Sequence, residues 1–324
     1  MKKWMILLAL LYLGSIVVSG QVPPGVGAAS FSRVGIDARP LAMGGAYVAV
    51  KAATPIPYYN PAGLVFAAPI SVGGMYSEPF GEELGIAFQS LNAVGKLSLS
   101  KEPPQAIGIG ATLIQLTIDD IPLWDETNPG SSAFFTATSA AYMISAGIPL
   151  LDDWAVGASV KLYQEDILEG QGRGVGFDVG LIGSIAIDET PITLGLNAMD
   201  VGRTRIRWRG TEGEPDNYVT WTNKVGVAAK FWEQRVLVSG EFDWAVGRPA
   251  REQAVHVGIE VNPLAPVFIR GGMKSDLEGK LSVSAGLGLM LLDRFSLDYA
   301  YVPGRDLGAT HVLSIQVAFF RSDE

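Results

Sequence analysis

Residues 281–289 read Leu-Ser-Val-Ser-Ala-Gly-Leu-Gly-Leu, and this stretch decides the fold class. Its alternate positions are apolar, namely Leu281, Val283, Ala285, Leu287 and Leu289. The positions between them hold only serine and glycine. Successive side chains of a β-strand point to opposite faces of its sheet, so this period of two predicts a strand with one apolar face and one polar face.

The same alternation recurs through the second half of the chain. The segments that carry it are 155–165, 174–187, 225–231, 236–244, 255–261, 295–301 and 313–319. The N-terminal strands are less regular, and residues 83–99 fit either one bent strand or two. Alternation by itself does not distinguish a soluble β-sandwich, which buries its apolar parity, from a membrane barrel, which turns that parity toward lipid.

The lengths of the connections favour the barrel, because they alternate between short and longer. The short ones are 149–153, 188–190, 233–234, 262–265 and 292–294. The longer ones are 168–173, 204–218, 245–250, 275–279 and 302–308. Short periplasmic turns and longer external loops are typical of bacterial barrels. The sequence therefore predicts an all-β, transmembrane antiparallel β-barrel of about 14 strands over residues 67–320, followed by a short tail, 321–324.

The composition agrees with a membrane barrel. Hydrophobic residues make up 48% of the chain and charged residues only 18%. The mean hydropathy is +0.26, yet no apolar run after residue 20 approaches the length of a spanning helix. A barrel spreads its apolar residues over alternate positions of many strands. The net charge of -9 argues against a nucleic-acid partner, which would favour a basic surface.

The first twenty residues predict export. Lys2 and Lys3 precede an apolar run, Trp4–Val18, that ends in the small residues Ser19 and Gly20. This is the pattern of a cleavable signal peptide, with cleavage before Gln21. The chain has no cysteine, and so no site for lipidation and no thiolate ligand for a metal. We therefore expect the mature chain in the outer membrane of a Gram-negative-type cell, in contact with its lipid.

Charged residues on the polar parity are expected to line the lumen. They are Lys161, Glu165, Asp178, Lys224, Lys230, Arg235, Glu241, Asp243, His256, Glu260, Arg270, Lys274 and Asp298. Turn positions place Arg235 opposite Glu260 and Arg270 opposite Gly258, one diagonal step from Glu260, which predicts an Arg235, Glu260 and Arg270 cluster. Neither His256 nor His311 has the neighbours of a catalytic triad or a metal site, and both fit lumenal hydrogen-bonding histidines. We expect no enzymatic activity, no cofactor and no metal.

Residues 21–66 lack alternation and are rich in small residues. Two motifs stand out, one from Arg39 to Gly45 with Met43, Gly44 and Gly45, and the turn Asn60-Pro61-Ala62-Gly63. A segment so rich in glycine and alanine cannot build its own core, whereas a barrel of about 14 strands is wide enough to admit it. We expect a plug inside the barrel, with Arg39 paired to a lumenal carboxylate.

These motifs resemble the N-terminal region of FadL-like outer-membrane proteins, and more closely that of the PorV/PorQ group. The resemblance continues in 172–180, 194–202 and 295–311, and so covers most of the mature chain. It implies a hatch inside the barrel. Resemblance to PorV implies a companion of type IX secretion that binds exported proteins, and resemblance to FadL implies passage of hydrophobic small molecules. A structural or adhesive surface barrel remains a third reading.

Overall fold

The computed structural model describes most of the chain after residue 26. The described residues are 27–51, 56–81, 84–101, 104–123, 133–151, 153–187, 190–211, 213, 216–246, 253–304 and 308–319. The predicted signal peptide and the tail 321–324 lie outside them. Within these ranges, no helix is both long and apolar enough to cross a membrane.

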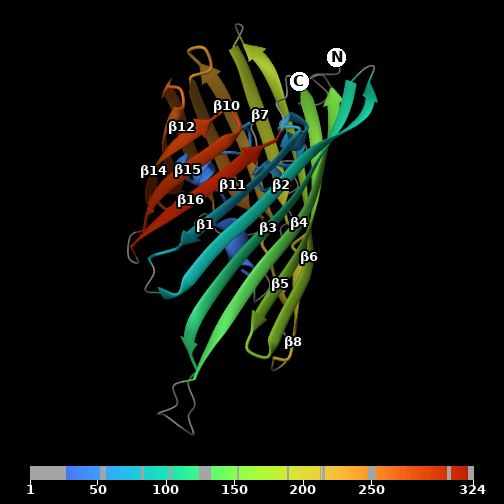
Figure 1. Ribbon diagram of the computed structural model, residues 1–324. Coiled ribbons are helices and arrows are strands. Elements are labelled where there is room, and N and C mark those ends of the chain that lie inside the picture. Colours follow the sequence, from blue (N-terminus) through green and yellow to red (C-terminus); the bar gives the residue numbers. More distant parts are fainter. Residues whose placement is uncertain are drawn as a thin grey trace.

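The described strands form a closed antiparallel barrel of 14 strands, as the sequence predicts (Figure 1). In chain order they are β1 (Ile70–Glu78), β2 (Ile86–Lys101), β3 (Pro104–Pro122), β4 (Phe134–Leu151), β5 (Trp154–Ile167), β6 (Gly170–Ile187), β7 (Thr190–Met199), β10 (Thr222–Phe231), β11 (Val236–Ala245), β12 (Ala254–Leu264), β13 (Val267–Asp276), β14 (Leu281–Leu291), β15 (Phe295–Pro303) and β16 (Ala309–Ala318). The first and last strands pair, so the ring has no free edge.

Two short strands lie outside the ring. β8 (Arg205–Arg209) and β9 (Asp216–Tyr218) belong to the long connection between β7 and β10. β8 pairs with the first residues of β6, beyond the point where β7 ends. This pairing satisfies backbone groups that β6 would otherwise leave open at its outer end.

The wall is higher on one side than on the other. β2 to β6 run for 14 to 19 residues, whereas β10 to β16 run for 9 to 11. Residues 86–99 thus belong to one long strand, β2, rather than to two. The tall side projects past the rest of the barrel at the end opposite the short turns (Figure 1).

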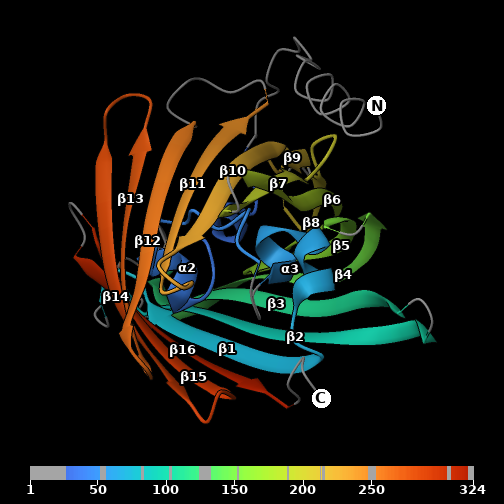
Figure 2. The ribbon, with the colours of Figure 1, turned by 90° about the horizontal axis from the view of Figure 1, so that it is seen from above.

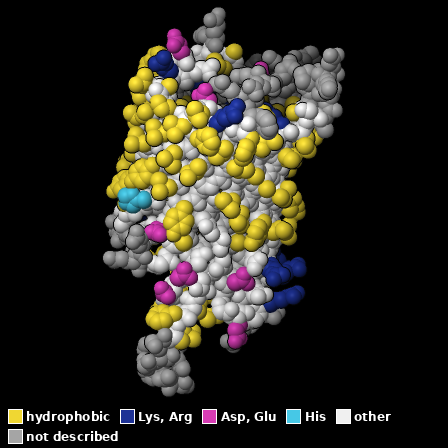
Figure 3. All heavy atoms as spheres, viewed as in Figure 1, with side chains coloured by type: hydrophobic (Ala, Val, Ile, Leu, Met, Phe, Trp, Pro, Cys, Tyr) yellow, Lys and Arg dark blue, Asp and Glu magenta, His cyan; other side chains and the backbone are white. Residues whose placement is uncertain are grey.

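The apolar parity faces outward, as expected for a lipid-facing surface. Val175, Phe177, Val227, Val283 and Leu287 are all exposed on the outer surface. Figure 3 shows hydrophobic side chains spread over the upper part of the wall, with acidic side chains mostly below them. An apolar exterior of this extent would aggregate in water, and lipid is the environment that accommodates it.

A charge placed on this surface tests the orientation. Leu287 is 55% exposed and lies near the middle of β14. We expect Leu287→Arg to destabilise the inserted barrel by about 2 to 4 kcal/mol, because arginine at the bilayer midplane is poorly solvated. The measurement is the fraction of heat-modifiable, fast-migrating protein in outer-membrane extracts. Leu287→Met is the matched control, and equal fractions for both variants would contradict the lipid-facing assignment.

The segment predicted as a plug lies within the ring of strands (Figure 2). We call its described residues, 27–51 and 56–66, the inner segment. It contains the short helices η1 (Ser30–Arg33), α2 (Ala38–Ala42), α3 (Ile56–Tyr59) and η2 (Pro61–Phe66). α2 contacts β13 to β16, and η2 contacts β2 to β6, so the segment bridges opposite sides of the barrel.

Candidate functional site: the inner segment and the barrel wall

The inner segment depends on the wall to satisfy its backbone. Its helices are too short to pair most of their own N–H groups. Wall side chains accept these bonds instead: Ser314 Oγ lies 2.7 Å from Ala38 N, and Glu165 Oε1 lies 2.8 Å from Ala29 N. Glu241 Oε2 accepts from both Tyr47 N and Val48 N, at 2.8 and 2.7 Å. Polar side chains at inward-facing positions of the strands therefore accept hydrogen bonds from the backbone N–H groups of this segment.

Arg39 forms an ion pair between the inner segment and the wall. Its Nε and Nη2 each donate to Glu260 at 2.7 Å, in the two-pronged geometry that suits a guanidinium and a carboxylate. Arg270 Nε donates to the same carboxylate at 2.6 Å and its Nη1 donates to Asp298 at 2.5 Å. Two arginines and two carboxylates thus form a balanced network at the start of α2.

Asp37 begins α2 and adds a second anchor. Its Oδ1 accepts from Arg39 N at 3.1 Å, and its Oδ2 accepts from Gln316 Nε2 at 2.7 Å. Burial, and then the nearby charge of Asp298, raise the pKa of Asp37 to about 6. The Asp37 carboxyl is therefore more easily protonated than an ordinary aspartate, while its hydrogen bonds hold the helix start against β16.

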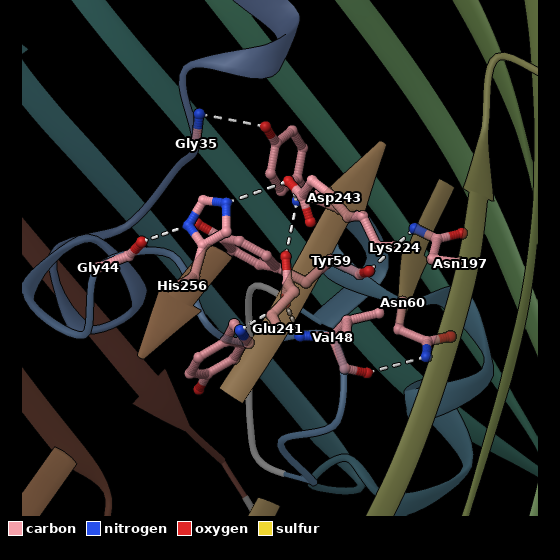
Figure 4. A network of polar contacts seen from close by, with 12 residues as sticks. Gly35, Gly44, Val48, Tyr59, Asn60, Asn197, Lys224, Glu241, Asp243 and His256 are labelled. Carbon is pink, nitrogen blue, oxygen red and sulfur yellow. Dashed lines mark hydrogen bonds and ion pairs between the residues drawn. The ribbon is translucent and has the colours of Figure 1, made fainter. Parts of the chain in front are cut away.

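A second network lies at the middle of the lumen (Figure 4). Lys224 Nζ lies 2.8 Å from Glu241 Oε1 and 2.7 Å from Asp243 Oδ2. His256 Nδ1 donates to the Gly44 carbonyl at 2.6 Å, and its Nε2 lies 3.3 Å from Asp243 Oδ2. The wall here holds the inner segment on two sides, at Gly44 and at the Tyr47 and Val48 amides.

Glu241, Asp243 and His256 are also the residue types that bind divalent metals, and their ligand atoms lie within 4.8 Å of one another. However, the ammonium of Lys224 already bridges the two carboxylates. The second oxygen of Glu241 is occupied by two backbone N–H groups. The lysine thus supplies the positive charge that a metal would otherwise bring, and we assign the group to a structural ion network.

A third network joins the wall to the base of the β7–β10 connection. Lys161 Nζ lies 2.8 Å from Asp178 Oδ1 and 3.0 Å from Asp200 Oδ2. Tyr163 Oη donates to Asp200 at 3.0 Å. All three charged side chains are at most 2% exposed. The ammonium is held by two carboxylates, as a buried charge requires.

The Asn60-Pro61-Ala62 turn docks on the opposite wall. The Asn60 Oδ1 accepts from Ala62 N at 3.1 Å and so begins η2. Its Nδ2 donates to three carbonyls, those of Val48 at 2.9 Å, Leu181 at 3.1 Å and Leu196 at 3.2 Å. One side chain therefore ties the turn to another part of the inner segment and to two wall strands.

Glycines in the wall make room for both ends of the inner segment. Gly157 and Gly180 leave no space for a β-carbon, because the Asn60-Pro61-Ala62 backbone and side chains lie directly against them. Gly258 and Gly272 play the same part for Met43 and Gly44 on the other side. The glycine content of the strands thus follows from close approach of two backbones.

The lumen has one side with few charges, which we call the apolar side, and one charged side. On β1 to β4 the inward side chains include Met75, Phe88, Ile114 and Met143, each at most 4% exposed, together with buried uncharged polar side chains such as Ser90, Asn92 and Thr112. They form one cluster with the aromatic side chains of the inner segment, which are Phe31, Tyr47, Tyr58 and Tyr59. The charged networks described above belong mainly to β5, β6 and β10 to β15.

Two hollows flank the inner segment. One of about 520 Å³ is lined by Arg33, Tyr58, Lys224 and Asp243. The other, of about 470 Å³, lies near the short turn after β10 and is lined by Lys51, Lys230 and Trp232. The inner segment therefore lies between two vestibules, one toward each end of the lumen.

Three predicted lumen charges lie elsewhere than expected. Arg235 is exposed in the turn before β11. Trp232, Glu233 and Gln234 adopt left-handed backbone angles in this turn, so pairing with β12 begins only at Val236. The predicted Arg235 contact with Glu260 is therefore wrong, and Leu237 lies opposite Glu260 instead. Lys230 and Lys274 lie on the inward parity but are exposed at the two ends of the lumen rather than enclosed within it.

The predicted register between β12 and β13 is also corrected. Arg270 lies directly opposite Glu260, rather than opposite Gly258, because the turn at 265–266 is tighter than the sequence suggests. The expectation for His311 is wrong as well. This histidine lies on the outward parity of β16, is exposed, and its Nδ1 lies 2.7 Å from Tyr299 Oη.

Several anchoring residues are absent from the sequence prediction. Ser284 and Ser314 lie on the polar parity of their strands and could have been included on that ground. Asp37 and Asp200 carry no alternation signal; Asp37 lies just before the Arg39–Gly45 motif, and Asp200 lies in the stretch 194–202 that carries part of the resemblance. The remaining predicted charges on the wall, including Glu165, Asp178 and Asp298, face inward and contact the networks or the inner segment.

Comparison with known proteins identifies the fold. No protein-family model and no curated protein sequence matches the chain. Among solved structures, the toluene transporter TbuX of Ralstonia pickettii matches with a TM-score of 0.57 at 14% identity, over 88% of this chain and 99% of that one. The toluene transporter TodX of Pseudomonas putida gives 0.56 at 14%, over 87% and 96%. A FadL homologue of Pseudomonas aeruginosa gives 0.55 at 12%, over 93% and 100%.

Proposed function

We propose that this chain is an outer-membrane barrel for the passage of hydrophobic small molecules, closed at rest by its inner segment. In this proposal residues 1–20 direct export and are removed, residues 21–66 act as the plug, and residues 67–320 form the barrel. The protein is not an enzyme and requires no cofactor. Its ligands are apolar compounds of low molecular weight that partition from the outer side.

The observation that carries the proposal is the apolar side of the lumen. A pore for polar solutes gains nothing from Met75, Phe88, Ile114 and Met143 on its inner wall, since water-filled barrels are polar inside. These side chains contact the inner segment at rest. A shift of the inner segment away from them would open a path whose wall suits an apolar solute.

The anchors on the charged side are proposed to fix the resting position. Arg39, with Met43, Gly44 and Gly45, holds α2 against β12 to β14. Asn60, with Pro61, Ala62 and Gly63, holds the start of η2 against β5 to β7. Because the contacts on the apolar side are mostly non-directional, we expect the inner segment to detach from the wall on that side first.

The fold neighbours agree with this reading more than with secretion. Those neighbours are two toluene transporters and a FadL homologue, and none of the three is named as a secretion component. The PorV-like role, binding exported proteins, therefore rests on the motif resemblance alone. A structural or adhesive barrel would use its outer loops and would not require a two-sided lumen.

A polar substitution on the apolar side tests the proposal. Met143→Gln is expected to lower the uptake of labelled toluene several-fold in cells that lack channels of their own, because an amide must be desolvated each time an apolar solute passes it. Ile182→Gln is the matched control. Ile182 is also buried and inward-facing, but lies on β6 in a separate apolar cluster with Ala62 and Ala155.

Two outcomes would overturn the passage function. Toluene uptake equal to that of cells without the protein would show that the barrel does not pass toluene. Equal loss in the Met143 and Ile182 variants, at equal amounts of folded barrel, would contradict the assigned path. Capture of exported proteins by the unaltered barrel, without toluene uptake, would favour the secretion reading.

A further inference from the structure

An arginine-rich face lies on the outer surface of the barrel, at the outer ends of β6 and β8. β8 reads Arg-Ile-Arg-Trp-Arg. Ile206 and Trp208 are buried and belong to the inner apolar cluster. Arg205, Arg207 and Arg209 must therefore point the other way, and all three are exposed.

Strand pairing places this face directly beside the lipid-facing band. Tyr142, Leu162 and Val175 form a row across β4, β5 and β6, and each is about half exposed. The next row toward the outer end is Gln164, Arg173 and Arg207. The third row is Asp166, Gln171 and Arg209. The outward-facing side chains thus change from apolar to cationic between one row and the next.

The central pair of this face is electrostatically unfavourable on its own. Arg173 and Arg207 are directly opposite each other, and like charges at such positions repel. Arg205 is paired with Asp216, whereas no ion pair joins Arg173, Arg207 or Arg209 to a carboxylate among the residues that the structure describes. On its other side Arg207 lies opposite Asp216 of β9, and that carboxylate forms its ion pair with Arg205.

The same residues line a hollow on the surface. It has a volume of about 890 Å³, and its lining includes Tyr142, Leu162 and Val175 together with Arg173, Arg207 and Arg209. Figure 3 shows Lys and Arg side chains gathered at one edge of the molecule, below the hydrophobic area. An occupant with an anionic head and an apolar body would satisfy both parts of this lining.

We propose that this hollow, the arginine face, binds a phosphorylated lipid of the outer leaflet, with its phosphate on Arg173 and Arg207 and its acyl chains along Leu162 and Val175. Guanidinium groups bind phosphate in two-pronged hydrogen bonds and are favoured over lysine for this purpose. A phosphate between the two arginines converts their repulsion into two charge-assisted contacts. The site lies at the height of the headgroups, where the apolar band ends.

The test uses the full-length barrel in a neutral detergent, titrated with bisphosphorylated lipid A and with the same glycolipid after removal of its phosphates. The readout is the thermal midpoint of heat-modifiable migration. We expect bisphosphorylated lipid A to raise the midpoint of the unaltered protein. Arg173→Gln combined with Arg207→Gln should require about tenfold more lipid, or a larger excess, for the same rise.

Matched controls separate this site from general charge effects. Arg235→Gln combined with Arg294→Gln removes two exposed arginines from the periplasmic turns, and should leave the titration unchanged. Without lipid, the Arg173 and Arg207 variant should be as stable as the unaltered protein or more stable, since repulsion is relieved. This second measurement shows that the variant folds.

Three results would overturn the proposal. The first is an equal rise of the thermal midpoint with the phosphate-free glycolipid, which would show that only the apolar part of the lining binds the lipid. The second is an equal loss of response in the control pair. The third is full competition by millimolar inorganic phosphate, which would make the site one for a free anion rather than for a lipid.

Discussion

Deletion of residues 27–66 is expected to raise the ion conductance of single barrels in planar bilayers at least about tenfold, because a barrel of this strand number is wide enough to conduct once its interior is empty. The inner segment now fills the space between two vestibules of about 520 and 470 Å³. Without it, the charged side of the lumen would be hydrated and the two vestibules would merge. Heat-modifiable migration of the deletion variant checks that the barrel still closes.

A full-length variant gives the same information without deletion. Arg39→Ala combined with Asn60→Ala removes the ion pair to Glu260 and the three side-chain bonds to backbone carbonyls. We expect conductance between that of the unaltered protein and the deletion, with frequent opening events. Glu78→Ala, at the far end of β1, is the control. If both the deletion and the double variant conduct like the unaltered barrel, the inner segment does not close the pathway.

The barrel could be predicted from the sequence because its signal is local. Alternation in 281–289 depends only on which face of one strand meets lipid, and every strand repeats that rule. The number of strands follows from counting such stretches and their connections. The rule fails only at the strand ends, as at Arg235, where three left-handed residues in the turn determine where the ladder begins.

The contacts of the inner segment could not be predicted in the same way. Arg39 and Glu260 are 221 residues apart, and the sequence indicated only that Arg39 would meet some carboxylate. Which carboxylate it meets depends on the stagger of the whole ring and on a turn at 265–266 that shifts Arg270 by two positions. The wall glycines are a further example, since Gly180 reads as an ordinary polar-parity residue until Asn60 is placed against it.

The two sides of the lumen explain how one segment can be both held and movable. Ion networks on the charged side are directional and lose most of their energy when one partner is removed. Contacts on the apolar side are non-directional, so the aromatic residues of the inner segment can shift along Met75 and Ile114 with a smaller change in energy. This asymmetry is the physical basis of the proposed passage.

The buried network around Lys161 is expected to give the largest change in stability. Lys161→Met should lower the free energy of unfolding by about 3 to 5 kcal/mol, because it leaves Asp178 and Asp200 buried without their cation. The two aspartates are at most 2% exposed, so water cannot replace the ammonium. The measurement is urea-induced unfolding of the barrel in lipid vesicles, followed by tryptophan fluorescence.

A compensating variant distinguishes loss of charge balance from loss of packing. Lys161→Met combined with Asp178→Asn should recover part of the lost stability, because Asp200 keeps the Tyr163 and Thr204 hydroxyls as donors at 3.0 and 2.8 Å. The difference between the double variant and the two single ones gives the coupling of the pair. Lys230→Met, a control at an exposed inward position, should change stability by less than about 0.5 kcal/mol. Equal losses for Lys161→Met and Lys230→Met would show that the buried ammonium contributes nothing beyond its hydrocarbon stem, and that the carboxylates are satisfied by other means.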